Sequence, residues 1–247
     1  MLYGDFMNAR IKLSARAALS GSQLKILPIL TALMFLVFAF SFCNAAVNMV
    51  QTADKLFLIA FSILSFFAFI AAVSPLRLRL EIKHLLLARG MNPSRRISLG
   101  LTGVLKSCGM CACLFCLKFI WFLFFEFIPL SAAVALAAYT AEKSLSLRAA
   151  YVIMGGIAVT AVAGLGFFSV FIQRYSMSMF YLACFKEMSV FEAIEESVKK
   201  TKNRLSEIMI FKLGFLPWFL LCLLIAPALF VIPYYKQSIT CCFLNSR

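Results

Sequence analysis

The chain has 247 residues, of which 63% are hydrophobic and 14% are charged, and 27 of them are Phe. About a quarter of the residues of a soluble domain are charged, so this chain has too few charged side chains to cover a core with a polar surface. Its many apolar residues also exclude a disordered or collagen-like chain. The composition therefore indicates an integral membrane protein.

The net charge of +14 comes from 24 Lys and Arg residues against 10 Asp and Glu residues. In a soluble protein, such an excess favours nucleic-acid binding. In a membrane protein, it arises where Lys and Arg are retained in cytoplasmic loops and lie against anionic lipids. The positions of the basic residues along the chain therefore decide between the two interpretations.

Two windows without charge come first, over residues 26–53 and 56–76. A helix needs about 20 apolar residues to cross about 30 Å of hydrocarbon. We predict spans over about 26–50 and 55–75, joined as a hairpin by a short polar turn. An amphipathic helix over about 6–19 is expected before them.

A basic segment follows the second window, with Leu residues interleaved among its charges. Arg89-Gly90 and Asn92-Pro93 are signals that end a helix. We predict an amphipathic interfacial helix over about 76–90. Its basic residues, and those just after it, are the candidates for binding anionic lipid headgroups: Arg77, Arg79, Lys83, Arg89, Arg95 and Arg96.

Residues 97–141 form a stretch that is too long for one ordinary span and has no polar loop to divide it into two. We predict one span over about 102–127, followed by a Pro-bent extension to about residue 141. A tight pair of helices is the alternative. Charged residues within a span are costly and are candidates for function. In and beside the spans these candidates are Lys106, Lys118, Glu126 and Arg174.

The simplest placement puts Lys106 and Glu126 near opposite membrane interfaces, so that only Lys118 needs a partner within the membrane. Arg174 follows the next predicted span, over about 149–173, and is expected at the cytoplasmic interface.

An amphipathic helix is then predicted over about 190–204, because Ser189 and Glu192 have the spacing of a capping box. A last span is predicted over about 212–233. It contains Pro217, Pro227 and Pro233, so the tail after it either stays on the far side or returns as a sixth, partial helix. The predicted fold is an all-α, polytopic transmembrane bundle of five or six helices with amphipathic interfacial helices, in one domain.

The orientation follows from the basic residues. Seventeen of them lie in the segments placed on one side, including the N-terminal segment, and Lys55, Lys143 and Arg148 lie on the other. Such a bias predicts a cytoplasmic N-terminus. It also explains most of the net charge, so no nucleic-acid partner is expected. The first window is too long for a signal peptide, and we expect it to stay in the membrane.

Sequence motifs for catalysis or metal binding are weak. Two CxxC pairs, from Cys108 to Cys116, point to different sides of a helix and are surrounded by apolar residues, where Cys acts as a small apolar side chain. The chain has one His, His84, and no HExxH, Walker A or GxSxG sequence. We therefore predict a non-enzymatic protein with no catalytic residues, no metal site and no cofactor. Gly156, Thr160 and Gly164 have the spacing of helix packing.

Short groups of residues recur in a familiar order: Ala15-Arg16-Ala17-Ala18-Leu19-Ser20-Gly21, Arg174-Tyr175-Ser176-Met177, Tyr181-Leu182-Ala183, Glu192-Ala193-Ile194 with Ser189 and Ser197, Phe211-Lys212-Leu213, Trp218-Phe219-Leu220-Leu221 and Pro233-Tyr234. These resemble the bacterial integral membrane proteins grouped as domain of unknown function 975. Cys184-Phe185-Lys186-Glu187 departs from the acidic turn expected there. The resemblance implies an all-helical fold in the bacterial cytoplasmic membrane and no established activity. A looser similarity to membrane regions of glycerophosphodiester phosphodiesterases suggests lipid-related work.

Two functions remain open at this point. The first is a structural or accessory role with anionic lipids, a membrane-protein partner or a second copy of the chain. The alternative is a small transporter that uses Lys118, Arg174 or a Pro-broken last helix. An aqueous cavity at Lys118 would favour the alternative.

Overall fold

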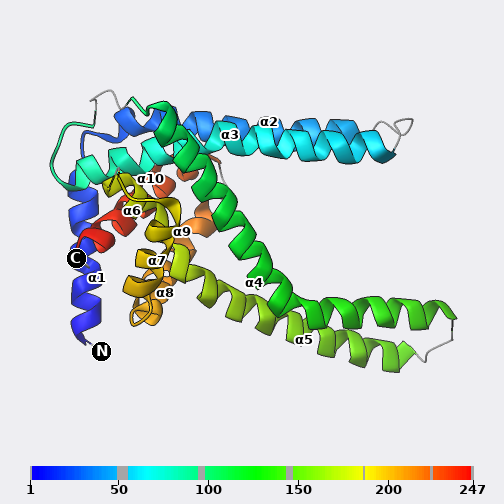
Figure 1. The fold of residues 1–247 in the computed structure, drawn as a ribbon. Helices are drawn as coiled ribbons and strands as arrows, with labels where there is room; N and C mark the ends of the chain where they lie inside the picture. The colour runs from blue at the N-terminus through cyan, green and yellow to red at the C-terminus, as the bar shows by residue number, and fades with distance from the viewer. Residues whose placement is uncertain are drawn as a thin grey trace.

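The computed structural model describes residues 2–48, 55–93, 98–142, 147–185, 187–222 and 225–245. Over these residues the chain is helical between short turns and has no β-strand. Two long helical hairpins project in the same direction from a group of shorter helices (Figure 1). Both chain ends lie with the shorter helices, away from the tips of the hairpins.

The first hairpin consists of α2 (Gln23–Asn48) and α3 (Lys55–Ala88). Its helices pack through apolar side chains, among them Phe40 and Phe69, whose ring centroids are 4.5 Å apart. Helix α1 (Leu2–Leu19) precedes it, and Gly21 makes the turn between α1 and α2 with a φ of 77°. That left-handed conformation is open to Gly at little cost.

Helix α3 differs from the sequence prediction. The span expected over 55–75 and the interfacial helix expected over 76–90 form one continuous helix, with Pro75 inside it. Proline removes one helical hydrogen bond, and neighbouring helices often stabilise such a site in membrane proteins. The second half of α3 is covered by protein, since Leu78, Leu80 and Leu85 are buried.

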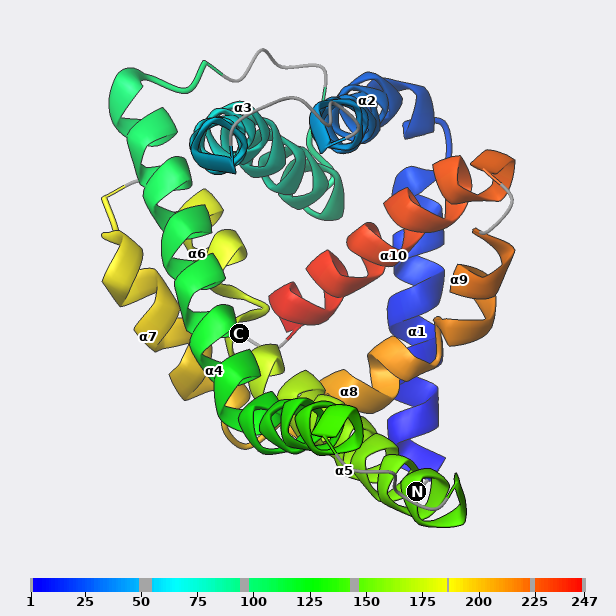
Figure 2. The same cartoon turned by 90° about the vertical axis from the view of Figure 1, so that its right-hand side faces the viewer.

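The second hairpin consists of α4 (Leu101–Glu142) and α5 (Leu147–Ile172). Helix α4 passes through Pro129 without interruption, so the alternative of two tightly paired helices within 97–141 is wrong. Helix α4 bends along its length. Beyond the bend, the two hairpins point in the same direction but are separated from each other (Figures 1 and 2).

Short elements follow the second hairpin: η1 (Gln173–Tyr175), α6 (Ser178–Cys184), α7 (Val190–Thr201), α8 (Leu205–Leu213), α9 (Leu216–Leu221) and α10 (Ile225–Asn245). Helix α7 begins with the capping box that Ser189 and Glu192 predicted. The span predicted over 212–233 is wrong, because that segment is divided among α8, α9 and the start of α10. One of the breaks falls at Gly214-Phe215, whereas Pro233 lies inside α10.

Helix α10 lies between α1 and the second half of α3 (Figure 2). Its Phe243 stacks on Phe180 of α6, with ring centroids 5.4 Å apart. Helix α1 buries Ala15 in the same region, and its Lys12 ammonium lies 4.8 Å from the ring centroid of Phe215. The amphipathic helix predicted over 6–19 therefore packs its apolar face against protein.

The described residues contain four stretches long and apolar enough to cross a membrane: Lys25–Val47, Phe57–Ala88, Leu101–Tyr139 and Tyr151–Cys184. Their outward surfaces carry exposed aromatic residues such as Phe38, Phe67 and Phe124. The prediction of an all-helical, multi-pass membrane protein is thus confirmed. Within the described part of the chain, the structure supports four spans instead of a bundle of five or six.

Candidate functional site

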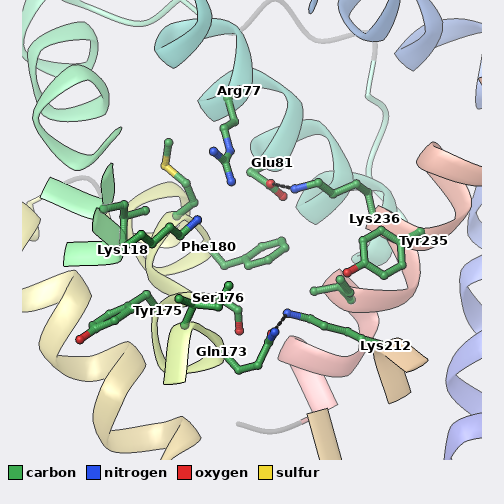
Figure 3. Close-up of a pocket in the computed structure, with 14 residues that line it drawn as sticks. Arg77, Glu81, Lys118, Gln173, Tyr175, Ser176, Phe180, Lys212, Tyr235 and Lys236 are labelled. Atoms are coloured by element: carbon green, nitrogen blue, oxygen red, sulfur yellow. Dashed lines mark hydrogen bonds and ion pairs between the residues drawn. The ribbon is translucent and has the colours of Figure 1, made fainter. Parts of the chain in front are cut away.

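A cavity of about 290 Å³ lies where α3, α4 and α10 meet the turn that follows α5. Small-molecule sites have volumes of roughly 300–1,000 Å³, so this cavity has room for a compact group. Five of its lining side chains carry charge at neutral pH: Arg77, Glu81, Lys118, Lys212 and Lys236. Figure 3 shows these five side chains converging from α3, α4, α8 and α10.

Among the residues that the structure describes, Glu81 is the one acidic side chain lining the cavity, and it forms an ion pair with Lys236. The carboxylate is 1% exposed, so it requires a cationic partner to remain charged. Arg77 and Glu81 are four residues apart on α3, which places both on one face of the helix. The pairing uses the charge of Lys236 and leaves the other three cations without a carboxylate in the cavity.

Gln173 and Ser176 contribute polar groups at the turn after α5. The Gln173 side-chain oxygen accepts a hydrogen bond from the Lys212 ammonium. The Ser176 hydroxyl is buried and has no hydrogen-bond partner among the described residues, although Ser176 lines the cavity. A buried polar group without a partner costs free energy unless a ligand or water satisfies it.

Lys212 lies on α8, outside the four apolar stretches. Burial, together with the nearby positive charges of Lys236 and Lys118, lowers the pKa of its ammonium to about 8. The cavity therefore concentrates positive charge to a degree that the protein alone does not neutralise.

Arg77 and Lys118 both point into the cavity in Figure 3. In the described part of the chain, neither side chain forms an ion pair with an acidic residue, and the Glu81 carboxylate is bound to Lys236. An arginine next to a lysine offers a planar pair of donors and a compact point charge. This combination is suited to an oxyanion.

The turn that carries Gln173 and Ser176 is held by α7. The Ser197 hydroxyl donates to the Arg174 carbonyl oxygen at 2.7 Å and accepts from the Met177 backbone N–H at 3.2 Å. Thr201, one helical turn later, donates to the same carbonyl at 3.1 Å. The backbone of Arg174 thus serves as an anchor, while its guanidinium lies 4.6 Å from the Phe171 ring centroid and outside the cavity lining.

A second polar contact joins α3 to α10 one turn beyond Glu81. His84 and Gln237 are both fully buried, and His84 Nδ1 lies 2.7 Å from Gln237 Oε1. The Gln237 amide also donates to the His84 carbonyl oxygen at 3.3 Å. This contact fixes the register of α10 on α3 and, with it, the position of Lys236 opposite Glu81.

The predicted headgroup-binding residues do not form one surface. Arg77 faces the cavity, Lys83 donates to the Lys25 carbonyl oxygen at 3.0 Å, and Arg89 Nη2 lies 3.8 Å from Cys184 Sγ. Arg79 has a buried Nε with no hydrogen-bond partner in the described residues. Arg95 and Arg96 lie outside the described residues. Because the second half of α3 packs against other helices, its basic residues point in several directions.

The predicted intramembrane residues also separate. Lys118 lines the cavity, whereas Lys106 donates to the Met188 carbonyl oxygen at 3.1 Å. Glu126 is buried where α4 approaches α5, with its carboxylate against Gly164. The sequence placed Glu126 at the membrane interface opposite Lys106 and did not predict this contact between helices.

Sequence reasoning missed Glu81, Gln173, Lys212 and Lys236 as members of one site. One local signal was present, since Arg77, Glu81 and His84 lie at helical spacing on one segment. Lys212 and Lys236 bound the last charge-free window, but their approach to Glu81 and Gln173 depends on contacts between distant parts of the chain.

Among the described residues, no group of three His, Cys, Asp or Glu side chains is placed to hold a metal ion. The chemistry that the cavity offers is binding of negative charge by Arg and Lys, with hydroxyl and amide groups beside them. Comparison with known proteins gives no match: no family model, no curated protein and no solved structure matches this chain. The resemblance to domain of unknown function 975 stays a prediction.

Proposed function

We propose that this chain is a non-enzymatic membrane protein that binds the phosphate-type group of an anionic ligand in the cavity between α3, α4 and α10. The observation that carries this proposal is the charge imbalance, because four cationic side chains and one carboxylate line the cavity. At an effective dielectric constant of about 20, a unit anion about 4 Å from one ammonium group gains about 4 kcal/mol. A phosphate monoester and an anionic lipid headgroup share the required chemistry.

The donors support a tetrahedral oxyanion. A guanidinium such as that of Arg77 binds two oxygens of a phosphate at once, and Lys118 and Lys212 supply point charges. The unsatisfied Ser176 hydroxyl is a further donor. Phosphate groups offer three strong acceptor oxygens and up to two negative charges, which corresponds to this set of donors.

The test uses inorganic pyrophosphate as the probe and isothermal titration calorimetry on the full chain in neutral detergent micelles. Replacing Lys118 by Gln removes one unpaired cation, and charge-assisted hydrogen bonds contribute roughly 1.5–3 kcal/mol. We expect the Lys118→Gln variant to bind pyrophosphate at least about tenfold more weakly. Lys200→Gln removes an equal charge from an exposed position on α7 and serves as the matched control. Equal affinity in the two variants would overturn the proposal.

Transport of the same group is a second candidate, favoured by the position of Lys118 at the cavity instead of at a helix contact. The test is uptake of radiolabelled phosphate into proteoliposomes. Uptake that requires Lys118 would support transport. Pyrophosphate binding without uptake would support a binding or accessory role.

We also infer that the protein lies in the bacterial cytoplasmic membrane with its N-terminus in the cytoplasm. The charge bias and the resemblance described above support this placement. Membrane lipids, a membrane-protein partner or a second copy of the chain are the partners that such a protein would meet.

A further inference from the structure

A second cavity, of about 200 Å³, adjoins the cationic one between α3 and α4. Apolar side chains form most of its lining: Phe66, Phe69, Ile70, Val73, Leu114 and Phe115. We call it the apolar groove. The rings of Phe66 and Phe115 pack against each other in its wall, with centroids 4.9 Å apart.

The two cavities meet at shared residues. Arg77, Leu114 and Lys118 line both the cationic cavity and the apolar groove. A molecule that occupied both would therefore have its charged end beside Arg77 and Lys118 and its apolar end along α3 toward Phe66. The sequence of α3 supports this polarity, since Phe66 and Phe69 precede Arg77 by two to three helical turns.

The groove lies between two helices whose exposed surfaces are apolar. Phe115 is 47% exposed, and Phe67 and Phe119 on the same two helices are exposed as well. Both walls belong to stretches long and apolar enough to span a membrane. An acyl chain in the surrounding lipid would reach the groove without crossing water, whereas a soluble anion would leave the groove without a matching partner.

We propose that the ligand is an anionic lipid, with its phosphate in the cationic cavity and one acyl chain in the apolar groove. This inference rests on the proposed function, because it identifies the class of ligand for the same site. Each buried CH₂ contributes to binding, so a lipid should bind far more tightly than a free phosphate compound that fills the cationic cavity alone.

The main experiment is photolabelling of the full-length wild-type chain in neutral detergent micelles. The probe is phosphatidic acid with a photoreactive diazirine in one acyl chain, and the control probe is phosphatidylcholine with the same chain. Mass spectrometry of the digested protein then locates the labels. We expect phosphatidic acid to label residues 66–73 and 111–115 at least fivefold more than phosphatidylcholine does, and excess pyrophosphate to abolish that difference.

Three results would decide against the lipid. Equal labelling by the two probes would overturn it, as would labelling concentrated on α2 and α5. Groove labelling that persists in excess pyrophosphate would show that the headgroup does not occupy the cationic cavity. If pyrophosphate still binds and Lys118→Gln still weakens its binding, the lipid inference fails while the proposed function stands. If pyrophosphate does not bind the wild-type chain, both fail.

A pair of variants gives a second measurement. Val73→Trp fills the groove, and Phe67→Trp adds the same side chain at an exposed position on the same helix. Val73→Trp should weaken retention of dioctanoyl phosphatidic acid, measured by native mass spectrometry, at least tenfold. Its affinity for pyrophosphate should stay within twofold of the wild type, which also shows that the variant is folded. Equal retention in the two variants would contradict the acyl-chain position.

Discussion

Ser197 joins helix α7 to the turn that carries Gln173 and Ser176. Its hydroxyl makes two hydrogen bonds with the backbone of that turn, one to the Arg174 carbonyl and one from the Met177 N–H. Ser197 itself is fully buried. The Ser197 hydroxyl therefore helps to hold one wall of the cavity in place, although it does not line the cavity.

The Ser197→Ala variant tests this role. It leaves the buried Met177 N–H without its partner, at a cost of about 1–3 kcal/mol. We expect that loss in the free energy of unfolding, measured by titration with sodium dodecyl sulfate in mixed micelles. Ser206→Ala, at an exposed position on α8, is the control and should change stability by less than about 0.5 kcal/mol. Similar losses in both variants would argue against the anchor.

Lys212 gives the cavity a dependence on pH. Burial, followed by Lys236 and Lys118, lowers its pKa to about 8, below the value of about 10.4 for an exposed lysine. A lowered lysine pKa means that protonation disfavours the fold below pH 8 and that this cost disappears as the pH rises through about 8 to 10.4. A bound anion would offset the same cost.

Anion affinity should consequently fall as the pH rises through 8. Sulfate is a suitable probe, because its charge does not change in this range. We expect calorimetry to show weaker sulfate binding at pH 9 than at pH 7, with proton uptake on binding near pH 8.5. In Lys212→Gln the affinity should be lower and should no longer fall through pH 8. An unchanged pH profile in that variant would show that another group titrates.

Local signals in the sequence predicted some of these residues and could not predict others. The capping box was predictable because Ser189 and Glu192 are three residues apart and interact through one helical turn. Lys118 was identified because a charge within an apolar stretch is unusual. The pairs Glu81–Lys236 and Gln173–Lys212 join residues 155 and 39 positions apart, so no local pattern indicates them.

At the scale of elements, α4 and α5 are in close contact at Gly164. A Cβ atom at this position would lie 2.7 Å from Glu126 Oε1 and 2.9 Å from the Phe125 carbonyl oxygen. The second of these atoms belongs to the backbone and cannot rotate away. Gly156, on the same helix, has no atom within 4 Å of such a Cβ. Of these two small residues, therefore, only Gly164 serves close packing within the chain.

The pair Gly164→Ala and Gly156→Ala tests this contact. Overpacking at Gly164 should lower the free energy of unfolding by about 1–3 kcal/mol. Gly156→Ala should be neutral or stabilising by up to about 1 kcal/mol, because Ala favours the helix over Gly. Unfolding in mixed micelles measures both. Equal effects would show that α4 and α5 are not packed at Gly164.

Helix boundaries show where pattern-based prediction ends. The hairpin of α2 and α3 follows from two charge-free windows, but the continuation of α3 beyond Pro75 does not, because its charges resemble those of an interfacial helix. Contacts with α10 accommodate Glu81 and His84 of this segment, through Lys236 and Gln237. The prediction from the last charge-free window was wrong for the opposite reason. This window is apolar enough for one span, yet it divides into α8, α9 and the start of α10.

At the scale of the whole molecule, both hairpins extend to one side and the chain ends lie on the other (Figure 1). With a cytoplasmic N-terminus, the ends of α2 and α4 should reach the opposite side of the membrane. Alkaline phosphatase is active only outside the cytoplasm, so fusions after Asn48 and Glu142 should be active. A fusion after Asn245 should be inactive. If only one of the first two fusions were active, the tips of the two hairpins would lie on opposite sides of the membrane, which would contradict the parallel hairpins.

The central claim is that the cationic cavity holds an oxyanion. Tungstate is a tetrahedral oxyanion with strong anomalous scattering, so X-ray diffraction from crystals grown with it locates the bound anion directly. We predict one anomalous peak among Arg77, Lys118 and Lys212, and its loss in crystals of Lys118→Gln. A cavity without a peak, in crystals where tungstate binds elsewhere on the protein, would contradict the claim.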